Sequence, residues 1–437
     1  MRLSLPAKSD QNPVSRLKVL LLSPFFYPET ISTGKYNTVL TQALARAGAD
    51  VTVIDSHPFY PGWKPVRSEA GVEGISVLRG GAWVRYPSIV ILRRLVFEVW
   101  YSLYVWWTVC TRCRTPDIVI AVFPPVLFFA LMPLFRNACR NVGIVHDFQG
   151  KLGLRGKRFL SKAVRSIVRK AEAKAFQRCQ MLIVLSQSMA EVANGEYGVD
   201  RKRIRVAYPF VTLDRANKPG KNLVHLFAPE FQHVVYSGAL GKKQNPLLLF
   251  QLFRAAAQKT HNVHFHIFSE GPLFEEILRL HEKEPVPGLT LQGLVPEPDL
   301  PELYARSTVQ VIPQAEGTSD ACLPSKLPNI LAAGCALFAI CDEQSELSDI
   351  VRTCLGKVVS SWDLAVLVTH LSEFLSQSNA VTRSARQTAV VRLLEEQFSL
   401  DALVRAVLNQ ADDVGLNSAT VADDQTPAVS PCRNNAT

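Results

Sequence analysis

The sequence lacks the features that mark membrane-spanning, secreted and metal-binding proteins. Its first eighteen residues carry four positive charges but no apolar segment before Leu17, so they do not resemble a secretory signal. Residues 118–135 carry no charge but contain three prolines, and residues 95–110 are too short to cross a bilayer. The nine cysteines are scattered, and Cys110 and Cys113 have no second pair. This favours a reduced cytosolic chain over a disulfide scaffold or a zinc site.

Signatures of covalent and metal-dependent catalysis are also absent from the sequence. There is no Ser/His/Asp or Cys/His arrangement, and the residue types that bind metals do not cluster at useful spacing. We therefore expect no metal ion and no cofactor.

What is present is a globular composition with an uneven distribution of charge. The 437 residues are 48% hydrophobic and 20% charged, which excludes a disordered, collagenous or coiled-coil chain and suffices for two or three domains. Residues 1–214 hold 30 basic and 14 acidic side chains, whereas residues 215–437 hold 18 and 24. This asymmetry indicates that the first half meets an anionic surface, either nucleic acid or a membrane leaflet. Composition alone does not choose between them.

Strand and helix patterns alternate along both halves of the chain. In the first half, strands are predicted at 17–22, 50–54, 117–123, 143–145 and 181–185, with a helix at 35–47. In the second half, strands are predicted at 233–236, 264–268, 289–292, 309–312 and 336–340, with helices at 246–258, up to 280 and at 327–333. This alternation predicts an α/β protein with two doubly wound, Rossmann-like domains. We expect a flexible leader at 1–16, domains at 17–214 and 223–395, and a disordered tail at 413–437.

Two segments of the first half suit a membrane surface. Residues 95–110 are rich in aromatic side chains, contain the single acid Glu98 and have arginines on both sides. Residues 151–174 hold nine basic side chains and one acid, Glu172, and helical spacing separates their apolar and basic faces. Such a helix either lies on anionic lipid or is a solvated helix of a basic domain, and the sequence leaves both interpretations open.

Loops after strands are the expected ligand sites of a doubly wound sheet. Residues 29–34 lead directly into a helix, and Gly34 either admits a phosphate to free backbone N–H groups or simply starts the helix. Residues 237–244 combine small side chains with Lys242 and Lys243, which suits a diphosphate or ordinary solvated surface.

The most specific loop is residues 314–334, which enters a helix through Pro324-Ser325-Lys326. We expect Ser325 to cap that helix and Lys326 to lie beside its positive end. This arrangement collects an anion and is of little use for packing alone.

Three segments together resemble the family 4 retaining glycosyltransferases of GT-B fold, most closely the colanic-acid-type exopolysaccharide glycosyltransferases. They are the opening 20–63, VVYSGALGKKQN and DACLPSKLPNILAAG, within a resemblance that extends from about residue 17 to 410. It implies two Rossmann-like domains facing across a cleft, with the nucleotide sugar mainly in the C-terminal domain and the acceptor mainly in the N-terminal one. It also implies that a helix at 396–412 crosses back to the N-terminal domain.

The resemblance assigns roles to individual residues. It implies catalytic roles for Asp147, Lys243 and Lys326, with the two lysines neutralising the donor diphosphate. Donor contacts are implied for Gly34, Gly238, Lys242, Glu270, Gly271, Asp320, Ser325 and Asn329, and acceptor-side contacts for Thr33 and His146. His146 is alternatively a satisfied core residue.

The sequence departs from the family pattern at three positions. Ala239 stands where many members have an arginine, and Lys326 can replace that charge. Ala321 and Asn329 stand where many members have two glutamates, with Asp320 adjacent to the first position. We expect Asn329 to hydrogen-bond a ribose hydroxyl instead.

The implied reaction transfers a sugar, with retention, from a GDP- or UDP-linked donor to a polyprenyl-diphosphate-linked glycan in exopolysaccharide synthesis. We expect a cytoplasmic enzyme, peripheral on the inner face of the plasma membrane, that meets anionic lipid through its basic N-terminal domain and binds no nucleic acid. The alternatives are another GT-B activity, such as an epimerase, and a catalytically degenerate assembly partner.

Overall fold

The structure is a computed structural model that describes residues 16–29, 31–60, 62–113, 115–131, 139–149, 160–213, 220–318, 323–377 and 382–408. Of residues 160–163 it describes the backbone only. The expected leader up to residue 15, the basic residues 151–159, the boundary residues 214–219, Asp320 and the expected tail lie outside the described residues.

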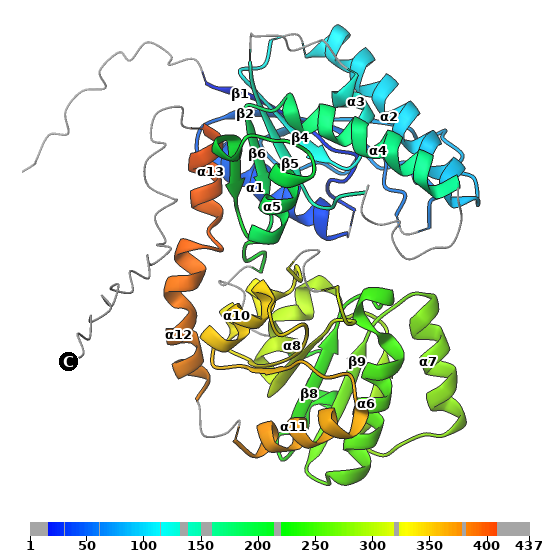
Figure 1. Ribbon diagram of the computed structural model, residues 1–437, viewed down its shortest axis with the longest axis vertical. Helices are drawn as coiled ribbons and strands as arrows, with labels where there is room; N and C mark the ends of the chain where they lie inside the picture. Colours follow the sequence, from blue (N-terminus) through cyan, green and yellow to red (C-terminus); the bar gives the residue numbers. More distant parts are fainter. Residues whose placement is uncertain are drawn as a thin grey trace, which may run out of the picture.

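The described chain forms two lobes, each built on a parallel sheet with helices on both faces (Figure 1). The first lobe comprises β1 (Lys18–Leu22), α1 (Ser32–Arg46), β2 (Asp50–Ser56), β3 (Ile75–Gly80), α2 (Val90–Arg112), β4 (Ile118–Phe123), α3 (Leu127–Ala130), β5 (Arg140–Val145), α4 (Leu160–Gln177), β6 (Met181–Val184), α5 (Gln187–Gly195), a 3-10 turn (Arg201–Arg203) and β7 (Ile204–Val206). Its strand order is β3-β2-β1-β4-β5-β6-β7.

The second lobe repeats this architecture with six strands in the order β10-β9-β8-β11-β12-β13. It comprises β8 (Gln232–Ser237), α6 (Pro246–Lys259), β9 (Val263–Phe268), α7 (Pro272–Lys283), β10 (Leu289–Gln292), α8 (Leu300–Arg306), β11 (Val309–Pro313), α9 (Leu327–Ala333), β12 (Ala336–Ile340), α10 (Glu346–Thr353), β13 (Lys357–Val359), α11 (Leu364–Gln377) and α12 (Arg383–Glu396), with 3-10 turns at Val224–Leu226, Lys242–Gln244 and Glu297–Asp299. The predicted pair of doubly wound sheets is therefore confirmed.

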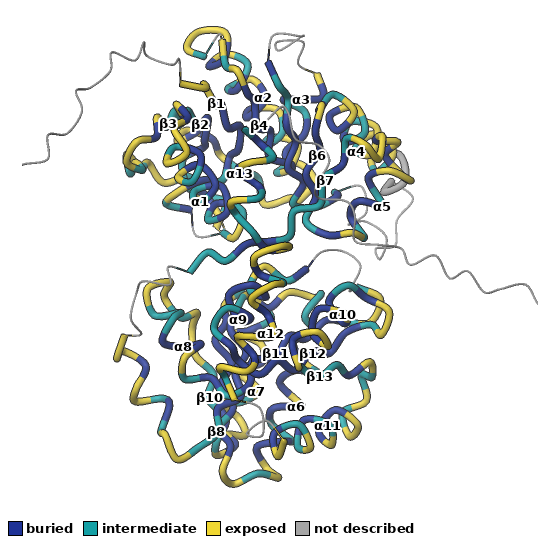
Figure 2. The backbone as a smooth tube through the Cα atoms, turned by 90° about the vertical axis from the view of Figure 1, so that its left-hand side faces the viewer, coloured by how far each residue is buried: buried dark blue, intermediate teal, exposed yellow. Residues whose placement is uncertain are grey.

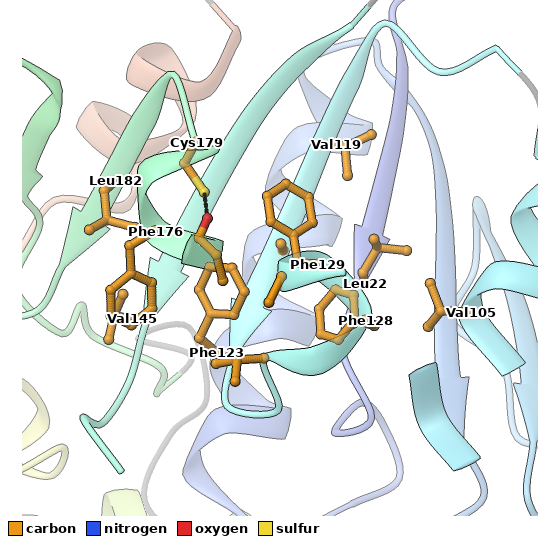
Figure 3. Packing of buried hydrophobic residues seen from close by; sticks show 14 of the residues in the cluster. Leu22, Val105, Val119, Phe123, Phe128, Phe129, Val145, Phe176, Cys179 and Leu182 are labelled. Atoms are coloured by element: carbon orange, nitrogen blue, oxygen red, sulfur yellow. Dashed lines mark hydrogen bonds between the residues drawn. The ribbon is translucent and has the colours of Figure 1, made fainter. Parts of the chain in front are cut away.

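Alternation along the strands divides the core of the first lobe into two layers. In β1, Leu20 and Leu22 point to the face covered by α2, α3, α4 and α5, whereas Val19 and Leu21 point to the face covered by α1. Figure 3 shows the first layer, where side chains from β4, β5, α3 and α4 interlock and Cys179 donates to a backbone carbonyl of α4. Both sheets are buried along most of their length, and exposure concentrates on the outer helices and loops (Figure 2).

The two acids of the membrane-suited segments both turn inward. Glu98 of α2 accepts hydrogen bonds from the backbone N–H groups of Val126 and Leu127, and so fixes the start of α3 after the two prolines. Glu172 of α4 is buried and accepts hydrogen bonds from Gln149 N–H and from the Tyr197 hydroxyl. The outer surface of these helices is therefore more basic than the residue counts suggest.

An apolar stripe, consisting of Leu92, Leu95, Val99, Leu103 and Trp107, runs along the outer side of α2 and is exposed. The spacing of three or four residues places these side chains on one face of the helix. The opposite face, with Trp100, Tyr101 and Val105, lies in the core. No described helix is both long enough and apolar enough to cross a membrane. On the predicted apolar face of α4, Val164 and Ile167 are exposed and Ala175 is buried.

The chain passes between the lobes twice. It leaves β7 through residues 207–213, which we call the linker, and it returns after α12, so that α13 (Leu400–Leu408) packs beside α1 on the first lobe (Figure 1). Leu403, Val404 and Val407 of α13 share a core layer with β1 and α1. Direct contacts also join the lobes, including the ion pair of Lys35 with Glu297 at 3.0 Å.

Candidate functional site

The loops at the carboxyl ends of the two sheets meet at the junction of the lobes. The Tyr36 hydroxyl, at the start of α1, donates a 2.9 Å hydrogen bond to the carbonyl of Ser325, just before α9. Ligands of doubly wound sheets bind at these strand ends. A ligand of either sheet would therefore bind near this junction.

Lys326 is held against the end of β8. Its ammonium nitrogen donates to the carbonyl oxygen of Ser237 at 3.1 Å and lies 3.7 Å from the centre of the Tyr236 ring. A cation on the face of an aromatic ring is favourable, but the carbonyl and the ring carry no compensating negative charge. Burial accordingly lowers the pKa of Lys326 to about 7.

Gly238 lies directly beside this ammonium group. Its φ of 144° is accessible to glycine and strained for other residues, and a Cβ atom there would lie 3.5 Å from the Lys326 ammonium nitrogen. The structure therefore brings Gly238 and Lys326 together.

Lys243 faces the other lobe. It lies in the 3-10 turn after Gly238, and its backbone carbonyl accepts a hydrogen bond from Ala315 N–H at 2.7 Å. Its charge acts on Asp147, at the end of β5 in the first lobe. Burial raises the pKa of Asp147 above its usual value, and the positive charge of Lys243 opposes that shift. The charge of Lys243 thus acts on Asp147 across the junction of the lobes, and among the described residues the two side chains form no ion pair.

His146 is a neutral group at the same strand end. Burial lowers its pKa to about 4, and its ring centre lies 6.3 Å from that of Tyr36. A neutral imidazole can accept or donate one hydrogen bond but cannot neutralise a phosphate. This supports either of the two predicted roles, acceptor contact or core residue.

Gly34 is explained by packing within its own lobe. A Cβ atom at this position would lie 2.9 Å from the carbonyl oxygen of Glu29, so the loop after β1 closes only over a glycine. Thr33 is partly exposed on the same first turn of α1.

The remaining donor-side predictions are scattered around the second lobe's strand ends. Glu270 and Lys242 are exposed, and Gly271 adopts a φ of 99° as the residue that precedes α7. Ser325 does not cap α9: Lys326 occupies the capping position, and no side chain caps the helix. Ser325 instead contributes its carbonyl to Tyr36.

Asn329 makes contacts that the sequence did not predict. Its side-chain oxygen accepts hydrogen bonds from Thr212 N–H at 3.0 Å and Leu213 N–H at 3.3 Å, and its amide donates to the Thr212 hydroxyl at 3.0 Å. The side chain is buried, so these bonds attach the linker to α9. Asn329 therefore holds the linker in place.

Comparison with known proteins agrees with this architecture. Residues 33–215 match the family model described as Glycosyltransferase Family 4. The chain is 25% identical over 363 residues to the Escherichia coli K12 protein named as a colanic acid biosynthesis glycosyl transferase, WcaI, covering 78% of this chain and 88% of that protein. The chain is a glycosyltransferase.

Solved glycosyltransferases share the fold of this glycosyltransferase across both lobes. WaaG, involved in lipopolysaccharide biosynthesis, superposes with a TM-score of 0.64 at 13% identity, covering 90% of this chain and all of WaaG. HepE of Anabaena, solved with UDP-glucose, gives 0.61 at 14% identity over 90% of this chain and 98% of HepE. Sucrose-phosphate synthase of Thermosynechococcus elongatus gives 0.67 at 14% identity over 90% and 97%. The fold is GT-B.

Sequence reasoning missed three residues of the candidate site. Tyr236 and Tyr36 were not singled out, although one precedes the predicted loop 237–244 and the other follows Gly34 by two positions. Glu172 drew notice only as the single acid of a basic segment, yet its bond to Gln149 N–H fixes the loop that carries Asp147. The sequence did offer a signal for Glu172. A single acidic side chain in an otherwise basic helix suggests that this side chain is buried and hydrogen-bonded.

The described residues contain no group of three or more side chains that could hold a metal ion. A cavity of about 400 Å³ lies beside β3 and is lined by residues that include His57, Arg67 and Arg79. None of the predicted site residues lines this cavity.

Replacing Asn329 with alanine separates the two roles of this residue. Two backbone N–H groups of the linker would lose their partner, so we expect the free energy of unfolding to fall by about 1–3 kcal/mol, measured by calorimetry. Affinity for nucleotide sugars, measured by titration calorimetry, should change less than twofold. A large loss of affinity at unchanged thermal stability would instead support the ribose contact.

Proposed function

We propose that this glycosyltransferase transfers a sugar from a nucleotide-sugar donor, with retention, to a lipid-linked glycan acceptor. The observation that carries the proposal is the ammonium group of Lys326, enclosed beside Gly238 without a compensating anion among the described residues. A donor diphosphate supplies two negative charges to such a group. HepE, solved with UDP-glucose, supports a nucleotide sugar as the donor.

The two lysines would act on the leaving group. As the bond between the anomeric carbon and the diphosphate oxygen breaks, negative charge grows on the diphosphate, and Lys243 and Lys326 stabilise it. The acceptor hydroxyl oxygen attacks the same face of the anomeric carbon, and its proton passes to the departing diphosphate oxygen. This scheme requires no protein nucleophile. Asp147, within the influence of Lys243, would contact and orient the acceptor hydroxyl.

A lipid-linked acceptor fits the surface of the first lobe. Both α2 and α4 run back from the carboxyl edge of the sheet, so their first turns lie at the edge that carries Asp147. Ile89 and Ile91, just before and within the first turn of α2, are exposed, and Ile167 is exposed further along α4. Exposed Arg94 lies beside them. Apolar side chains flanked by arginine suit the boundary of an anionic membrane, and such docking would bring the acceptor's diphosphate to the site.

An assembly partner without transferase activity is the second candidate. It is favoured by one observation, the use of Asn329 to hold the linker where many similar proteins have a glutamate. An activity assay distinguishes the two candidates.

Purified protein incubated with a panel of nucleotide sugars and vesicles that contain polyprenyl-diphosphate-linked glycans should release nucleoside diphosphate with one donor and one acceptor. The anomeric configuration of the product, determined by NMR, should equal that of the donor. Lys243→Met and Lys326→Met should each reduce the rate about a hundredfold. Lys259→Met, at the exposed far end of α6, is the matched control. No release with any combination would favour the assembly partner.

Donor binding should depend on pH through Lys326. Because burial lowers the pKa of this side chain to about 7, its ammonium form is abundant at pH 6.5 and scarce at pH 8.5. Only the ammonium form attracts a diphosphate, so the affinity for the nucleotide sugar should fall by up to about tenfold per pH unit above pH 7. Lys326→Arg should remove this dependence, because a guanidinium stays charged throughout the range. Titration calorimetry showing equal affinity at both pH values would contradict the assignment.

The apolar stripe of α2 should determine membrane binding. Replacing both Leu95 and Leu103 with glutamine should weaken binding to anionic vesicles at least tenfold in co-sedimentation, because two apolar side chains no longer enter the membrane boundary. Thermal stability should not change, since both side chains are exposed. The matched control is the double replacement of Leu247 and Val366, exposed on the second lobe, which should bind normally. Equal vesicle binding by wild type, the stripe variant and the control variant would show that the stripe does not contact the membrane.

A further inference from the structure

Tyr36 connects the two lobes at the turn that carries Lys326. It lies in α1 of the first lobe, and its hydroxyl donates a 2.9 Å hydrogen bond to the carbonyl of Ser325 in the second lobe. The side chain is buried, and burial raises the pKa of its hydroxyl well above the usual value. The hydroxyl is therefore protonated, and able to donate, at neutral pH.

The ring of Tyr36 is fixed independently of this hydrogen bond. It meets the ring of Phe210 in the linker edge to face, with the centres 4.8 Å apart. On another side it lies near His146 at the end of β5. These contacts determine where the hydroxyl reaches, and Phe210 and His146 would retain them with a phenylalanine at position 36.

The carbonyl of Ser325 belongs to the same planar peptide unit as the backbone nitrogen of Lys326. A hydrogen bond to that carbonyl therefore fixes the orientation of the peptide from which the Lys326 side chain departs. At its other end, the ammonium group is fixed by Ser237 and Tyr236. The lysine is thus held by the first lobe at its backbone and by the second lobe at its charge.

We propose that Tyr36 is a positioning residue that places Lys326 against the donor diphosphate when the two lobes meet. The inference rests on the proposed function of Lys326 as a diphosphate ligand. It adds that the donor site of the second lobe is completed by a hydroxyl from the acceptor-side lobe. Donor binding and the contact between the lobes then strengthen each other to the same extent, because coupling between two equilibria is reciprocal.

Tyr36→Phe tests this directly, because it removes the hydroxyl and keeps the ring. We expect the dissociation constant of the nucleotide sugar, measured by titration calorimetry, to rise about threefold to tenfold, as expected for one lost hydrogen bond. In a Lys326→Met background, the same change should have no further effect on affinity. A merely structural role would not produce this dependence of one variant on the other.

Tyr208→Phe is the matched control. Tyr208 lies in the linker and stacks on Phe398, and burial, together with the nearby carboxylate of Glu346 in the second lobe, raises the pKa of its hydroxyl. Among the described residues, Tyr208 forms no hydrogen bond, ion pair or ring contact with Ser325 or Lys326. The affinity of the Tyr208→Phe variant for the nucleotide sugar should therefore stay within twofold of wild type. Thermal midpoints of all variants, measured with and without nucleotide sugar, show whether each protein is folded and report binding a second time.

Three outcomes would overturn the inference. Unchanged affinity in Tyr36→Phe would do so, as would an equal loss in Tyr208→Phe, which would indicate a general effect of lobe contacts. Persistence of the Tyr36→Phe effect in the Lys326→Met background would show that the hydroxyl acts elsewhere. A different result would overturn the proposed role of Lys326 as a diphosphate ligand: the Lys326→Met variant alone would bind the nucleotide sugar as tightly as wild type.

Discussion

The ammonium group of Lys326 is the interaction on which the arrangement of the second lobe's site depends. Enclosing a charge is costly unless an opposite charge or good hydrogen bonds compensate it. Here the compensation consists of one carbonyl oxygen and the face of Tyr236, and no acidic side chain among the described residues pairs with it. The lowered pKa expresses that deficit. A bound diphosphate, as proposed above, would supply the missing negative charge.

In the first lobe, by contrast, the inward-facing charged side chains have partners. Its acids at Glu29, Asp55, Glu98 and Glu172 are turned inward, where they accept hydrogen bonds from backbone N–H groups or pair with Arg79. Their removal from the surface leaves arginines and lysines outside, next to an apolar stripe on α2 that no other part of the described chain covers. One lobe thus carries an ammonium group without a paired acid, and the other carries basic side chains beside an exposed apolar stripe.

Much of the fold could be predicted from local pattern. Buried parallel strands are short apolar runs, and those predicted at 289–292, 309–312 and 336–340 agree with β10, β11 and β12 within one residue. The helix at 327–333 agrees with α9. The strands missed were β3, β7 and β13, which lie at sheet edges. Their sequences are less apolar because an edge strand is only partly buried, so apolar content gave no signal for them.

The site was less predictable, because side-chain direction is a tertiary property. Gly238 and Lys326 could be singled out by residue type, since small residues and lysines near strand ends suit a diphosphate whichever way they point. Asn329 shows the limit. An amide at that position suits a ribose and a linker equally well, and only the path of residues 212–213 over α9 reveals its contact with the linker. Ser325 shows the same limit, because its carbonyl rather than its hydroxyl makes the contact that matters.

The sequence by itself determined the two parallel sheets, the basic character of the first half and the residue types of a diphosphate site. These follow from periodicity, net charge and short motifs, which are properties of neighbouring residues. Only the tertiary structure decided which acids are hidden, which face of α2 remains uncovered, and that Tyr36 reaches Ser325 across 289 positions of the chain. Those outcomes depend on how two lobes and their connections pack in three dimensions, and local sequence carries no record of distances between segments so far apart.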